Sequence, residues 1–170
     1  MNEKILFKKI NFIKNYQIIG GIIGIIISIY LLFHSSLSNY QNLLGYFTMI
    51  TPFVFFSLCI YSGYLLKEKN YNKGFNLVLI TLFLQIVAFE IGDLFYSAVN
   101  GIGIKFTLNL MKDSIVGFDF HPSHFLIQFQ SDADNLIIKF NIIAIIMLFY
   151  VSNLIKEINK NVSIYKNIRR

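Results

Sequence analysis

Charged side chains, cysteine, proline and tryptophan are all scarce in this sequence. Asp, Glu, Lys and Arg make up 14% of the 170 residues, whereas apolar residues make up 55%. A water-soluble domain of this length has too little interior to bury so many apolar side chains. The composition therefore excludes an ordinary soluble domain and predicts a single membrane domain covering residues 1–170.

The absence of partners for Cys59, the single cysteine, excludes an internal disulfide and a multi-cysteine metal site. Because tryptophan is absent, tyrosine must supply the aromatic side chains that anchor a membrane protein at the interface. Tyrosines indeed fall near the ends of the apolar stretches, at Tyr16, Tyr30, Tyr46, Tyr64, Tyr96 and Tyr150.

Basic residues are present in excess, but they are confined to particular connections. They precede the first apolar stretch, separate the second from the third, and follow the fourth, whereas the other two connections contain few. An alternation of this kind is typical of a multi-pass membrane protein that obeys the positive-inside rule. The twelve residues concerned are Lys4, Lys8, Lys9, Lys14, Lys67, Lys69, Lys73, Lys156, Lys160, Lys166, Arg169 and Arg170.

This charge pattern predicts a bacterial inner-membrane protein with both termini in the cytoplasm. The net charge of +6 also raises the question of nucleic acid. The basic residues lie beside apolar stretches, where they fix topology and meet anionic lipid, and they are not interleaved with stacking aromatic residues. We therefore expect the lipid bilayer as a partner, and no nucleic acid.

The predicted fold is an all-α membrane protein, a four-transmembrane-helix bundle with a small extracytoplasmic β cap. The helices are expected at about residues 12–33, 44–66, 75–95 and 137–155, each an apolar run near the length that spans a bilayer. A cleaved secretory signal is the alternative interpretation of the first run. Pro52 is expected to bend the second helix.

The cap is expected over about residues 102–130, between the third and fourth helices, because the apolar period there changes to two. Apolar residues alternate with polar ones in three short runs, which predicts a three-stranded antiparallel sheet with turns at Lys112–Ser114 and His121–Ser123. The apolar side chains would share one face of this sheet. They are Ile104, Phe106, Leu108, Leu110, Val116, Phe118, Phe120, Phe125, Ile127 and Phe129.

Glu90 and Asp93 are the acidic residues nearest to the interior of a predicted helix. Three residues apart, they would share one helical face, and Lys139 in the fourth helix is the expected partner of Glu90. Ionisable residues in such positions mark either a structural ion pair or a site that handles protons or cations. Both interpretations stay open from the sequence.

Two further groups of residues are candidates for a site or an interface. Asp119, His121 and His124, with Asp132 and Asp134 nearby, are the only cluster that resembles metal ligands, although turns also favour such residues. Gly20, Gly24 and Ser28 recur every four residues, a spacing that lets helices pack closely within one chain or between two chains.

The sequence contains no nucleophile elbow, phosphate-binding loop or paired-cysteine motif, so we expect neither enzymatic activity nor a cofactor. The leading hypothesis is an accessory, regulatory or assembly subunit that binds a protein partner, or a second copy, through its cap or its basic cytoplasmic face. The alternatives are an oligomeric channel or small transporter, including an effector or accessory of a defence system, and an extracytoplasmic metal-dependent enzyme.

Overall fold

The computed structural model describes residues 3–34, 43–110, 116–129 and 136–168. Helices α1 (Glu3–His34), α2 (Leu43–Lys67) and α3 (Tyr71–Ile86) precede three strands. These are β1 (Val87–Ile91), β2 (Leu94–Asn109) and β3 (Val116–Phe129). Strand β4 (Leu136–Asn141) then leads directly into helix α4 (Ile142–Ile168).

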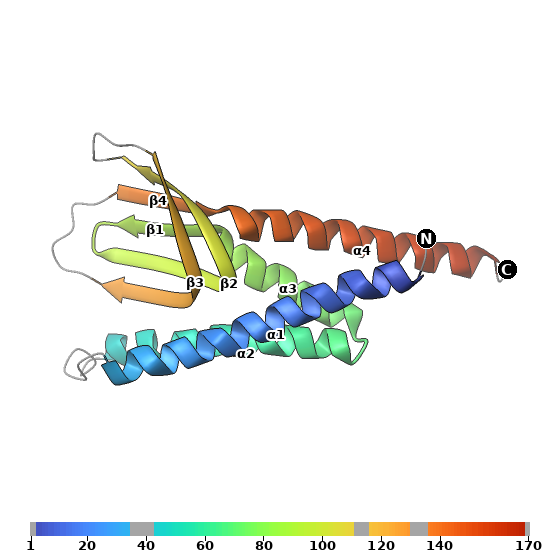
Figure 1. The fold of residues 1–170 in the computed structure, drawn as a ribbon, viewed down its shortest axis with the longest axis horizontal. Coiled ribbons are helices and arrows are strands. Elements are labelled where there is room, and N and C mark those ends of the chain that lie inside the picture. The colour runs from blue at the N-terminus through green and yellow to red at the C-terminus, as the bar shows by residue number, and fades with distance from the viewer. Residues whose placement is uncertain (1–2, 35–42, 111–115, 130–135, 169–170) are drawn as a thin grey trace.

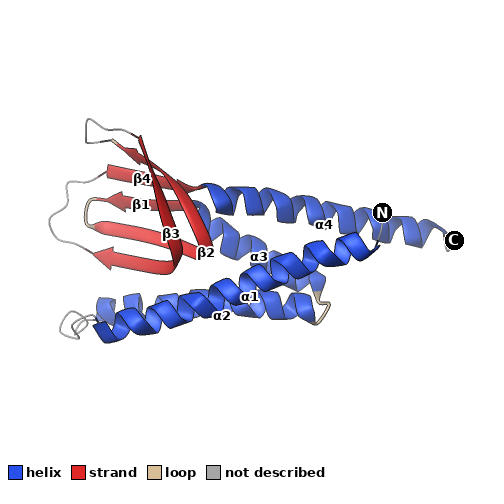
Figure 2. Cartoon of the chain, viewed as in Figure 1, coloured by secondary structure: helices blue, strands red, loops and turns tan. Residues whose placement is uncertain are grey.

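The helices lie along the long axis of the molecule, and the sheet occupies one end (Figure 1). Both chain ends and the α2–α3 turn lie at the opposite end (Figure 1). Figure 2 shows that α1 and α2 extend alongside the sheet instead of ending where the sheet begins. The sheet is therefore flanked by helices and is not a separate layer beyond them.

The predicted four-helix bundle with a three-stranded cap is wrong in its helices. Only α1, α2 and α4 are long and apolar enough to cross a membrane among the described residues. Helix α3 has 16 residues, which gives it a length of about 24 Å, whereas the hydrocarbon core measures about 30 Å. The third predicted helix thus ends at Ile86 rather than near residue 95, and the fourth begins at Ile142 rather than 137.

The prediction was also wrong in its strands. The described sheet is four-stranded, because the ends of the third and fourth apolar runs form β1 and β4. The expected turn at His121–Ser123 does not exist, since β3 continues through it and Pro122 pairs with Ile102. Proline is tolerated there because β3 lies at the edge of the sheet.

The physical reason for the misplaced helix is the hairpin between β1 and β2. Gly92 and Asp93 form a two-residue turn between the paired residues Ile91 and Leu94, and Gly92 has φ 52°. Turns of this type favour glycine because its backbone adopts positive φ without strain. The apolar run that ends in β1 resembles a helix in the sequence because an unbroken apolar run does not reveal its period.

Strand β2 bends in its middle and thereby pairs with three neighbours. Its register against β3 shifts between Val99 and Ile102, where Gly101 has φ 81°. The first half of β2 pairs with β1, the second half pairs with β4, and β1 pairs with β4. Strands β1, β2 and β4 therefore each pair with the other two, so β3 alone has a single strand neighbour among the described strands.

Two apolar cores hold these elements together. The first joins α1, α2, α3 and α4 and contains Ile13, Leu82 and Val151, each at 0% exposure. The second core lies between α2 and the first half of the sheet, where Phe55 and Phe56 pack with Ala98 and Phe125. Among the described residues, no equivalent apolar cluster covers the second half of the sheet.

Candidate functional site

The two faces of the sheet differ sharply in polarity. Residues paired directly across a sheet share a face, and alternate residues of a strand lie on opposite faces. By this register, one face carries the polar residues Lys105, Thr107, Asp119, His121, Lys139 and Asn141, and the other carries Ile104, Phe106, Phe118, Phe120, Ile138 and Phe140.

Burial runs opposite to the rule for soluble sheets. In β3, Phe118 and Phe120 are each 68% exposed. Asp119 and His121, which alternate with these phenylalanines, are half-buried. Lys105, which pairs with Asp119 across the sheet, is only 1% exposed. The polar face of the sheet is therefore the more buried one, and its apolar face is exposed. We call Ser97, Lys105, Thr107, Asp119, His124 and Lys139 the polar cluster.

Lys105 lies at the centre of the polar cluster and bonds two side chains. Its Nζ donates to Ser97 Oγ and lies 3.1 Å from His124 Nε2. The same imidazole nitrogen is 2.6 Å from Ser97 Oγ, and His124 Nδ1 is 2.9 Å from the Pro122 carbonyl. Since a carbonyl only accepts, Nδ1 carries the proton of the neutral ring and Nε2 accepts.

Burial shapes the protonation of this group. It lowers the pKa of Lys105 to about 8, and the nearby Lys139 lowers it further while Asp119 opposes the change. Burial lowers the pKa of His124 to about 4, with Lys105 contributing in the same direction. His124 is therefore neutral at pH 7, and Lys105 is charged but within reach of deprotonation.

Asp119 and Lys139 form the outer part of the cluster. Their side chains make an ion pair of 3.1 Å, and Thr107 Oγ1 donates to the same carboxylate oxygen at 2.8 Å. The Thr107 hydroxyl and Lys139 hold the pKa of Asp119 below its usual range. Lys139 thus forms an ion pair with Asp119.

Glu90 and Asp93, which we expected on one helix, lie in a strand and in a turn. Glu90 lies in β1 opposite Ile137, Lys139 lies opposite Ala88, and the two side chains are diagonal neighbours on the polar face. Asp93 belongs to the β1–β2 turn and is exposed. Glu90 and Asp93 therefore share no helical face, because neither residue is in a helix.

The candidate metal ligands lie close together without forming a ligand set. The rings of His121 and His124 are 5.0 Å apart. However, both nitrogens of His124 already have protein partners. In the described part of the chain, no three His, Cys, Asp or Glu side chains are arranged to hold a metal ion. Asp132 and Asp134 lie outside the described residues.

The small residues of α1 make close contacts within the chain. A side chain at Gly20 would meet the Gly101 nitrogen at 2.7 Å, and one at Gly24 would overlap the Phe56 ring. Ser28 Oγ donates to the Gly24 carbonyl at 2.8 Å. The missing side chain of Gly20 thus lets β2 pack closely against α1, and that of Gly24 lets α2 do so.

A second polar network, which the sequence analysis missed, joins α1 and α3 to the bend of β2. The Gln85 side-chain oxygen accepts from the Asn100 amide at 2.7 Å, and Asn100 Nδ2 donates to Gln17 at 3.1 Å. Ser123 Oγ donates to the Gly20 carbonyl at 3.0 Å. The sequence signal for this network is the presence of Gln17 and Gln85 as isolated amide side chains within apolar runs.

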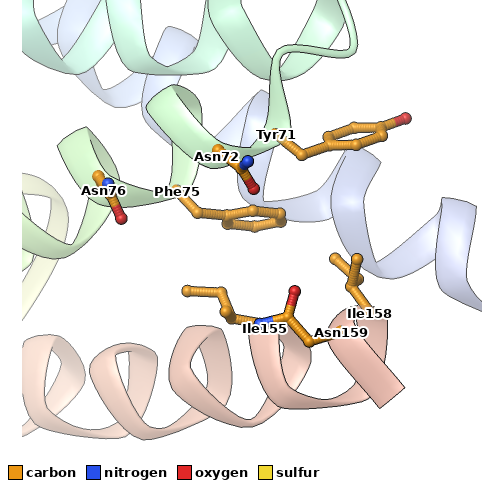
Figure 3. A pocket seen from close by; sticks show the side chains of 7 residues that line it. All are labelled: Tyr71, Asn72, Phe75, Asn76, Ile155, Ile158 and Asn159. Carbon is orange, nitrogen blue, oxygen red and sulfur yellow. The ribbon is translucent and has the colours of Figure 1, made fainter. Parts of the chain in front are cut away.

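One cleft opens between α3 and α4 near the chain ends. Its volume is about 330 Å³, and Tyr71, Asn72, Phe75 and Asn76 face Ile155, Ile158 and Asn159 across it (Figure 3). The described residues of the lining are tyrosine, phenylalanine, isoleucine and asparagine.

The Ser97, Lys105 and His124 side chains contain the groups of a nucleophilic site, but their burial opposes that role. Ser97 and Lys105 are each 1% exposed, so a substrate carbonyl has no access to Ser97 Oγ. No protein-family model, curated protein or solved structure matches the chain. The functional interpretation therefore rests on the geometry of the chain itself.

Proposed function

We propose that the chain is an integral inner-membrane accessory or assembly subunit, without enzymatic activity, that binds a protein partner through its sheet. Three apolar helices of membrane-spanning length support the membrane assignment. The basic residues of the described helices gather at the end where the chain termini lie (Figure 1). By the positive-inside rule, we expect that end in the cytoplasm and the sheet toward the outside.

The observation that carries the partner proposal is the free edge of β3. Strands β1, β2 and β4 pair with one another, so β3 is the only described strand with one neighbour. An unpaired edge presents a row of amide and carbonyl groups that another strand completes. Ser123 contacts α1, so the accessible part of this edge is Val116–His121.

A partner strand added to β3 would gain main-chain hydrogen bonds along this edge and would extend the apolar face that carries the exposed Val116, Phe118 and Phe120. Strand addition is a recurrent mode of protein recognition in which the backbone supplies affinity and side chains supply selectivity. The mode needs no catalytic group, which fits the burial of Ser97.

Paired proline substitutions at Gly117 and Phe118 test the proposal. Amides alternate in direction along a strand, so one of the two faces β2 and the other faces the free edge. The edge-facing substitution should preserve thermal stability in detergent and abolish a photo-cross-link from a benzophenone side chain at the exposed position of Phe120 in intact cells. The other should lower stability.

A benzophenone side chain at Asn72, on the far end of the molecule, is the control for non-specific cross-linking. Absence of a cross-link specific to position 120, or its survival in the stable, edge-facing proline variant, would contradict strand addition.

A channel or small transporter formed by several copies is the second candidate. The observation that favours it is the placement of Lys105, Asp119 and Lys139 on a protected face in a chain that is otherwise strongly apolar. Charges in membrane proteins frequently line a pathway. Reconstitution into planar bilayers separates the two functions, because a non-conducting protein excludes the channel.

A further inference from the structure

The exposed half of the sheet's apolar face forms a continuous surface on β2 and β3. We call it the outer patch, and its exposed fractions range from 36% to 68%. The Phe118 ring packs edge to face against the ring of the neighbouring Phe106. The outer patch consists of Ile102, Ile104, Val116, Phe118 and Phe120.

The outer patch continues the exposed surface of the membrane helices. Strand β1 follows α3 without a connecting residue, and β4 runs into α4 in the same way. Along the first of these joints, Phe83 in α3 is 70% exposed and Val87 in β1 is 36% exposed. On the face of the outer patch, β1 and β4 carry only Val87, Phe89, Ile91, Leu136, Ile138 and Phe140.

Helix lengths place these strands at the depth of the hydrocarbon. From Lys73 to Ile86, α3 rises by about 20 Å, and from Ile142 to Lys156, α4 spans a similar distance at 1.5 Å per residue. The hydrocarbon core is about 30 Å thick. If the lysines mark the cytoplasmic interface, the last third of the core is crossed by β1 and β4 rather than by helix.

Alternation in β3 supplies an independent argument. Val116, Phe118 and Phe120 face outward, whereas Gly117, Asp119 and His121 face the polar cluster. Membrane β-structures show this apolar-out, polar-in period because lipid covers one face and protein or water the other. A sheet exposed to water on that face would have the reverse pattern.

We propose that the outer patch contacts the acyl chains of the outer leaflet, so that the sheet is embedded in the membrane. The polar cluster is then shielded from lipid by the strands that carry it. Embedding also makes a partner at the β3 edge necessary, since an open sheet edge is not tolerated in hydrocarbon. The lipid contact itself does not depend on that partner.

The absence of tryptophan provides a clean test. Phe118→Trp and Phe120→Trp variants are placed in nanodiscs of phosphatidylcholine with brominated acyl chains, which quench only tryptophans in contact with them. Phe83→Trp on α3 is the positive control. Asp93→Trp, in the exposed β1–β2 turn, is the negative control. Gel filtration and circular dichroism confirm folding of each variant.

The expected result is quenching at positions 118 and 120 to the same extent as at position 83, with little quenching at position 93. Quenching of Phe118→Trp by aqueous iodide instead would place the patch in water and overturn the proposal. Protection from both quenchers would show that protein covers the patch, which also overturns it. The proline and cross-linking experiment can fail separately, so the two results distinguish lipid contact from partner binding.

Discussion

Replacing Lys105 by methionine should not destabilise the protein at pH 7, although Lys105 is buried and hydrogen-bonded. Burial and Lys139 lower its pKa from 10.5 to about 8. At about 1.4 kcal/mol per pKa unit, keeping the charge in the folded state costs on the order of 3 kcal/mol. Methionine has a similar length and no charge, so it removes this cost.

The gain is smaller than the full cost because the bonds from Lys105 to Ser97 and His124 are lost, at about 1 kcal/mol each. Ser97 Oγ and His124 Nε2 stay 2.6 Å apart and still satisfy each other. We therefore expect the free energy of unfolding of Lys105→Met to equal or exceed that of the wild type by about 1 kcal/mol.

The pH dependence gives a sharper readout. Between pH 8 and pH 10.5 the unfolded chain retains the lysine proton that the folded chain has released. The stability of the wild type should therefore rise across this window, and that of Lys105→Met should not. Thermal unfolding in detergent, followed by circular dichroism from pH 7 to pH 10.5, measures the difference.

Lys73→Met is the matched control, because it removes the same charge from an exposed position. Equal loss of stability in Lys105→Met at pH 7 and pH 10 would refute the reasoning, since it would show that Lys105 stabilises the fold in both protonation states.

Three other predictions concern single side chains. His124 must stay neutral in the folded state, so the wild type should lose stability as the pH falls from 6.5 to 4, and His124→Gln should lose less over that range in pH-dependent melts. Gly24→Val should destabilise by about 1–3 kcal/mol in denaturant titrations, because its side chain would overlap the Phe56 ring. Asp119→Asn should cost at most about 1 kcal/mol in the same titration, because the Asp119 side chain is 42% exposed.

Periodicity in the sequence predicts the strand character of β2 and β3, but not the four-stranded sheet or the ends of α3 and α4. The alternation of Ile104, Phe106 and Leu108, and of Phe118 and Phe120, is present in β2 and β3. By contrast, the strand period at Val87, Phe89 and Ile91 was concealed by an apolar residue at position 88 and by continuity with α3. The Gly92-Asp93 dipeptide was the local signal that a hairpin interrupts this run.

The polar cluster was beyond prediction for a different reason. Alternation correctly separates Lys105 and Asp119 from the phenylalanines, but it does not state which face is buried. In water the polar face would be exposed, whereas here Lys105 is 1% exposed and Phe118 is 68% exposed. The outcome depends on the bend of β2 at Gly101 and on the closure of β1, β2 and β4, which are contacts between distant segments.

Sidedness is the most direct test of the membrane assignment on which the account depends. Single cysteines are introduced at Asp93, in the exposed β1–β2 turn, and at Asn72, near the α2–α3 turn, in a Cys59→Ser background. A membrane-impermeant maleimide added to intact spheroplasts should label position 93 and should label position 72 only after lysis. Labelling of position 72 but not position 93 before lysis would contradict the orientation, and equal labelling of both would contradict the separation by a membrane.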